Sequence, residues 1–101
     1  MKPLALLVLV AAPLPLPASA ALSPFYDSAE KIETILGSGA VADALHQAPL
    51  RSIENTGTRA DGADEWMVHT QECDLVVYLI AVPPDGPGMT TYTLDVPKGC
   101  D

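Results

Sequence analysis

The sequence predicts an α+β fold in which two short helices pack on a four-stranded antiparallel meander sheet. Three observations predict it. Apolar residues recur at helical spacing between residues 27 and 48, and at strand spacing from residue 50 onward. The run 75–82 (Leu-Val-Val-Tyr-Leu-Ile-Ala-Val) is apolar on both of its faces, as in a central strand. Short turns join the predicted strands, which favours antiparallel neighbours.

The chain begins with the pattern of a secretory signal peptide, residues 1–20. Lys2 supplies a positive start, residues 4–16 form an apolar run, and Ala18-Ser19-Ala20 fits a small-x-small cleavage site. The run is broken by prolines and is shorter than the ~20 residues that a membrane span needs, and no cysteine follows it for lipid attachment. We therefore expect a secreted protein, in a bacterial periplasm by preference, with one small domain over residues 21–101.

Two short helices are expected next. Asp27 is predicted to cap the first, with Glu30 at capping-box spacing, and Gly37 suits its end. Ser38 is predicted to cap the second helix, and Pro49 to end it, because the residue before a proline is pushed out of the α region. A single helix kinked at the glycines is the alternative.

Four strands follow, the first polar enough to suit a sheet edge. Asp61-Gly62 marks the turn after it, and residues 72–74 leave room for only a tight hairpin. Residues 83–88 (Pro-Pro-Asp-Gly-Pro-Gly) can only be a loop. The strands are expected over residues 50–58, 65–72, 75–82 and 89–96. Either the sheet face away from the helices exposes an apolar patch, or side chains such as Arg51 and Met67 cover it.

The two cysteines, Cys73 and Cys100, are predicted to form one disulfide, because an even count in an oxidising compartment indicates pairing. Cys73 precedes the third strand and Cys100 follows the fourth. If these strands form an antiparallel hairpin, both cysteines lie at the same end of the sheet. A chain-entropy argument assigns such a link about 3.6 kcal/mol of stability.

The net charge of the chain indicates which classes of partner it could bind. The formal net charge is −8, and becomes −9 once Lys2 leaves with the signal peptide. Nucleic acids and anionic membranes attract clustered Lys and Arg, whereas this chain has scattered cations. A basic partner gains in association rate. Another secreted or envelope protein is therefore the expected partner, with a homodimer as a further possibility.

No catalytic, cofactor or metal motif is found, and we expect a protein that is not an enzyme. The cysteine spacing matches no zinc pattern, and the acidic turn lacks the alternating ligand spacing of an EF-hand loop. His46 and His69 are interpreted as surface residues. Ser28, Ser38 or Ser52 could complete a Ser-His-acid triad, but the sequence selects none of them.

A candidate interaction surface can still be named. The acids of the turn could attract a basic partner. The lone tryptophan beside them is either core or an interface anchor ringed by acids. Two tyrosines of the last strands could be cross-strand neighbours on one face. The candidate surface is Asp61, Asp64, Glu65, Trp66, Tyr78 and Tyr92.

The order of elements, two helices followed by an antiparallel meander, resembles the repeat of the β-lactamase-inhibitory protein and small outer-membrane assembly lipoproteins. This resemblance concerns the fold, and no residue is carried over from it. The first hypothesis for function is a secreted, non-enzymatic protein-binding module, inhibitor-like in character. It would contact its partner through one sheet face, or through the loops at residues 59–65 and 83–88. The alternative is a small ligand carrier or hydrolase with a pocket between the helices and the sheet, holding His46 or His69 beside a carboxylate.

Overall fold

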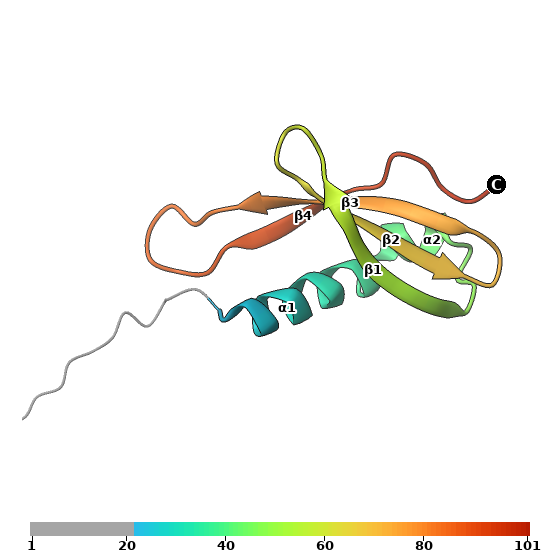
Figure 1. Ribbon diagram of the computed structural model, residues 1–101, viewed down its shortest axis with the longest axis horizontal. Coiled ribbons are helices and arrows are strands. Elements are labelled where there is room, and N and C mark those ends of the chain that lie inside the picture. Colours follow the sequence, from blue (N-terminus) through green and yellow to red (C-terminus); the bar gives the residue numbers. More distant parts are fainter. Residues whose placement is uncertain (1–21) are drawn as a thin grey trace, which may run out of the picture.

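The computed structural model describes residues 22–101 and has the predicted α+β fold (Figure 1). The predicted signal segment, residues 1–20, lies outside the described residues. Both helices lie on one face of a single four-stranded sheet, because their buried residues join the same apolar cluster. The elements are α1 (Pro24–Leu36), α2 (Gly39–Ala44), β1 (Leu50–Thr58), β2 (Asp64–Thr70), β3 (Asp74–Val82) and β4 (Thr91–Asp95).

The first helix begins before the residue predicted to cap it. Ser23 is the N-cap, and its side chain accepts a hydrogen bond from the backbone N–H of Tyr26. Pro24 starts the helix, because its fixed φ suits the first helical position and its missing N–H costs nothing there. The prediction of Asp27 as cap was therefore wrong. Asp27 lies in the first turn, where a carboxylate complements the helix dipole.

The second helix begins as predicted and ends early. The Ser38 side chain accepts a hydrogen bond from the N–H of Val41, 3.2 Å away. The helix stops at Ala44, well before Pro49, because the chain then passes through two left-handed residues, His46 (φ 54°) and Gln47 (φ 56°). The break between the two helices is confirmed, so the single kinked helix is not formed.

The sheet has strand order β1-β2-β3-β4 with every neighbouring pair antiparallel, as predicted. The turn between β2 and β3 falls slightly earlier than expected. Its centre is Gln71-Glu72, because the Thr70 side chain accepts hydrogen bonds from the N–H groups of Glu72 and Cys73. The third strand is internal, with β2 on one side and β4 on the other.

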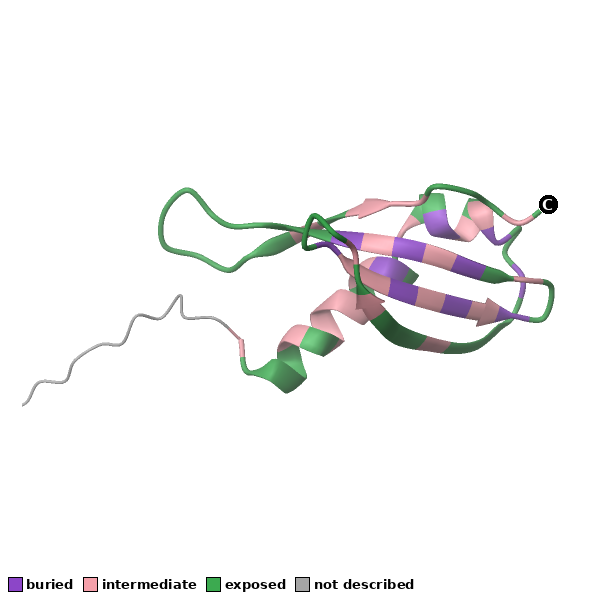
Figure 2. Ribbon diagram, turned by 45° about the horizontal axis from the view of Figure 1, so that its top comes forward, coloured by how far each residue is buried: buried purple, intermediate pink, exposed green. Residues whose placement is uncertain are grey.

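The core lies between the helices and one face of the sheet. Buried and partly exposed residues alternate along β2 and the first part of β3 (Figure 2). Trp66 and Val77 are opposite each other on this face, as are Val68 and Leu75. The buried cluster consists of Ile35, Val41, Leu45, Trp66, Val68, Leu75, Val77 and Leu79.

The predicted disulfide joins Cys73 to Cys100, with their Cα atoms 6.1 Å apart. It ties the segment after β4 to the start of β3, so both cysteines lie at one end of the sheet. The layout inferred from the strand pattern and the pairing inferred from cysteine count therefore agree. Both cysteines also contact the core cluster.

We predict that replacing both cysteines by serine lowers the free energy of unfolding by about 3.6 kcal/mol, the entropy that the closed loop removes from the unfolded chain. Urea unfolding followed by Trp66 fluorescence measures this. A loss below about 1 kcal/mol would contradict a stapling role for the link.

Candidate functional site

The candidate site is the sheet face turned away from the helices, called the open face here. Its side chains alternate with the core residues along each strand. Charged and polar groups occupy most of it, with Met67 and Val76 half-buried at its centre. The open face is formed by Ser52, Glu54, Glu65, Met67, His69, Asp74, Val76, Tyr78, Ile80, Val82, Thr93 and Asp95.

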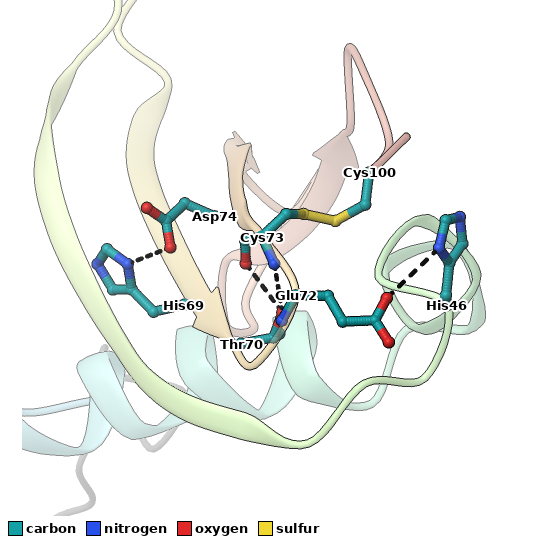
Figure 3. Close-up of a disulfide and its surroundings, with 7 residues drawn as sticks. All are labelled: His46, His69, Thr70, Glu72, Cys73, Asp74 and Cys100. Carbon is teal, nitrogen blue, oxygen red and sulfur yellow. Dashed lines mark hydrogen bonds and ion pairs between the residues drawn. A yellow bond between two sulfur atoms is a disulfide. The ribbon is translucent and has the colours of Figure 1, made fainter.

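His69 links three strands on the open face. Its Nδ1 lies 2.7 Å from a carboxylate oxygen of Asp74, and its Nε2 lies 2.7 Å from one of Glu54. Figure 3 shows His69 and Asp74 pointing toward each other beside the disulfide. The hydrogen bond to Asp74 and then that to Glu54 raise the pKa of the imidazole. An acceptor at each nitrogen favours the doubly protonated ring over the neutral one.

On neighbouring strands, Ser52 lies opposite His69, and His69 lies opposite Asp74. This is the set of residue types that a hydrolytic triad uses, and it borders a shallow hollow of about 360 Å³. A triad needs the imidazole as a base, with Nε2 free to accept the serine proton. Here Glu54 occupies Nε2 and favours the protonated ring. The arrangement is therefore a cross-strand ion pair rather than an activated nucleophile.

Arg59 organises the middle of the open face. It bonds to Asp61 at 3.0 and 2.9 Å and to Asp95 at 2.7 Å, and its guanidinium lies 4.4 Å from the centre of the Tyr78 ring. The hydrogen bonds from Arg59 lower the pKa of Asp61 to about 2. The Tyr78 hydroxyl donates to Glu65. This cluster lies over the Tyr78 ring, while Ile80 and Val82 further along β3 are exposed.

The acids of the predicted turn surface are all paired internally. Asp61 bonds to Arg59, Asp64 lies 2.6 Å from the amino group of Lys31, and Glu65 accepts from Thr56. A carboxylate that already interacts with a cation or a hydrogen-bond donor contributes less to the binding of a basic partner. The proximity of the acids in sequence did not reveal these long-range partners.

The aromatic members of the predicted surface lie apart. Trp66 is only 6% exposed and faces the helices, so it belongs to the core. Tyr78 is opposite Asp95 on the open face, whereas Tyr92 is opposite Ala81 and donates to Asp27 of α1. The prediction that the two tyrosines are cross-strand neighbours was wrong, because the register offsets them by an odd number of residues.

An exposed hairpin arm extends the loop at residues 83–88 further than the sequence indicated. Residues 80–91, called the arm here, are all exposed (Figure 2) and project beyond the helices (Figure 1). Ile80, Val82 and Met89 expose 37%, 40% and 44% of their surface. Residues 83–88 were identified as a loop, but the apolar run before them gave no sign that β3 continues past the core.

Comparisons with protein-family models, curated proteins and solved structures found no match to the chain. Within residues 22–101, no group of three or more His, Cys, Asp or Glu side chains is placed to hold a metal ion. No helix in the same range has the length and apolarity needed to cross a membrane.

We predict that His69 stabilises the fold more at low than at neutral pH. Its pKa is raised in the folded state above about 6.5, the value for the unfolded chain. The contribution of His69 to the free energy of unfolding is therefore complete below its pKa in the unfolded chain. It is lost as the pH rises through its pKa in the folded protein. Urea unfolding of wild type and His69→Gln between about pH 5 and pH 9 should show a stability gap that narrows with rising pH.

The matched control is His46→Gln, because His46 is half exposed and lies 3.9 Å from Glu72, beyond hydrogen-bond distance. A gap for His69→Gln that stays constant or widens with pH would contradict the ion-pair interpretation.

Proposed function

We propose that the chain is a small, secreted, non-enzymatic module that binds another secreted or envelope protein through the arm. The single observation that supports this most strongly is the exposure of every residue from 80 to 91, apolar ones included. A small domain has little apolar surface to spare, because most of it is needed for the core. Apolar side chains held away from the core are typical of a contact surface.

The composition of the arm also supports recognition. Pro83, Pro84 and Pro87 restrict the backbone of its tip. A restricted loop loses less conformational entropy on binding, so more of the contact energy contributes to affinity. Inhibitor-like behaviour would follow if the tip enters a cleft on its partner.

The geometry favours this module over a ligand carrier or hydrolase. That alternative requires a cavity between the helices and the sheet with a histidine beside a carboxylate. His69 has carboxylate neighbours, but it lies on the open face with both ring nitrogens occupied. The hollow beside α2, about 320 Å³, is lined by residues without titratable side chains: Leu36, Val41, Ala42, Leu45, Gln47, Ala48 and Leu50.

The test is affinity capture from the secreted or envelope fraction of the source cells, comparing wild type with Val82→Asp/Met89→Asp. Burying two apolar side chains contributes about 1.5 kcal/mol or more in total, which corresponds to about tenfold in affinity. We therefore expect the double variant to recover the partner at least about tenfold less efficiently, as quantified by mass spectrometry.

Leu50→Asp is the matched control, because Leu50 is 51% exposed and lies at the opposite end of the sheet. It should recover the partner as wild type does. Equal recovery by the arm variant, or loss with both variants, would contradict binding through the arm. Recovery of the chain's own copies alone would replace the proposal with a homodimer.

A further inference from the structure

The outer edge of β4 is the side of this strand that faces away from the sheet. In the strand order β1-β2-β3-β4, β4 pairs with β3 alone. Figure 2 shows β4 at the upper rim of the sheet. Among residues 22–101, no strand lies beyond it in the sheet, so its backbone can pair with a strand from another molecule.

The backbone groups that β4 directs outward follow from the ladder. The N–H of Thr70 donates to the carbonyl of Cys73, so the backbone groups of Cys73 face β2. Direction alternates along an antiparallel strand, so the even-numbered residues of β3 face β4, and their partners on β4 are odd-numbered. Tyr92 and Leu94 therefore direct their N–H and C=O groups outward. In the described part of the chain, these groups form no backbone hydrogen bond.

The two edges of the sheet differ in how they are protected. An exposed edge can accept another strand, and proteins protect such edges with bulges, charges or prolines. The register of β1 is irregular at two places, and Arg51 is exposed at one of them. β4 has a regular register and no lysine, arginine or proline, and its one acid, Asp95, is bonded to Arg59. Of the two edges, β4 is therefore the one suited to pair with a further strand.

An added strand has space for its side chains on both faces of the sheet. On the helix side, a hollow of about 180 Å³ lies between the start of α1 and the entry to β4. On the open face, Thr91 and Thr93 are exposed. The hollow is lined by Leu22, Asp27, Met89, Thr90 and Tyr92.

We propose that this edge pairs with β4 of a second copy of the chain, antiparallel and centred on Thr93. In that register Thr93 lies opposite Thr93 of the second copy on the two-fold axis, and Tyr92 lies opposite Leu94 of the second copy. Each Tyr92–Leu94 pair exchanges both of its N–H···O bonds, because both residues direct their backbone groups outward. The two sheets then become one continuous sheet with an isologous interface.

The side chains along the edge suit a second copy. The net charge of −8 disfavours self-association, but this repulsion is screened beyond about 8 Å at physiological salt. Residues directly opposite each other therefore decide the pairing. In this register Asp95 lies opposite Thr91 of the second copy, so no like charges face each other. A threonine pair on the axis is a favourable cross-strand neighbour, because its hydroxyls can hydrogen-bond.

The dimer leaves the arm available. Antiparallel pairing places the two arms at opposite ends of the joined sheet, so each can bind a partner. An interface made by short strands is small, and we therefore expect a weak dimer rather than an obligate one. This inference goes beyond the proposed role of the arm and does not rest on it.

The test follows the disulfide-bonded protein from about 10 μM to about 1 mM, the range in which weak dimers form. Sedimentation velocity measures the mass, and hydrogen exchange followed by NMR locates the contact. Exchange of the Tyr92 and Leu94 amides should slow by about tenfold when about nine-tenths of the chains are dimeric. The Thr93 amide faces β3 in both states, so its exchange should not respond to dimerisation.

Two threonine variants test the register at the same salt concentration. Thr93→Lys places like charges opposite each other on the axis and should weaken dimerisation by about two- to fivefold. Thr91→Lys changes the net charge equally, but it places the cation opposite Asp95 of the second copy. It should dimerise at least as tightly as wild type. Mixing Thr93→Lys chains with Thr93→Glu chains should restore dimerisation, because opposite charges then meet on the axis.

A protein that stays monomeric at about 1 mM would overturn the proposal. So would a dimer in which the Tyr92 and Leu94 amides exchange as fast as in the monomer, or equal weakening by the two lysine variants. None of these results depends on capture of another protein through the arm, so failure of the edge and failure of the arm are distinguishable.

Discussion

The whole structure depends on the pairing of β2 with β3. Trp66, Val68, Val77 and Leu75 meet across this pair and form the floor on which both helices rest. Burying side chains of this kind contributes about 1.5–3 kcal/mol each, so this apolar floor supplies a large share of a small domain's stability. The disulfide fixes the end of the same pair, because Cys73 follows the turn that joins the strands.

The two faces of the β2–β3 pair are stabilised by different interactions. The helix side is apolar and closed, whereas the open face is held by ion pairs that cross the strands. His69 connects β1, β2 and β3, and Arg59 connects the turn after β1 to β4. Such contacts are individually weak at a surface. Together they connect all four strands across the open face.

The sequence predicted the architecture because its signals were periodic and local. The bounds of the first strand, the cap at Ser38 and the pairing of the cysteines all follow from spacing and residue type. The start of α1 was misplaced because Ser23 and Asp27 are both good N-cap residues. Only Pro24, which suits the first helical position, indicates that Ser23 is the cap. The end of α2 depends on the left-handed backbone of His46 and Gln47, which could not be predicted because neither residue is a glycine.

The candidate site was harder to predict, because its contacts join residues far apart in the chain. The acidic turn contains the expected residues, but Lys31 and Arg59 bind its aspartates over distances in sequence that a local pattern cannot show. Assigning Tyr78 and Tyr92 to opposite faces required the exact register. The arm arises from where β4 starts, which the apolar pattern alone does not define.

The central claim is that recognition takes place at the arm rather than at the helices. The most direct measurement is the change in backbone amide chemical shifts when the captured partner is added to isotopically labelled protein. The account predicts that the largest changes fall on residues 80–91. Changes concentrated on α1 and α2, with the arm unaffected, would contradict it.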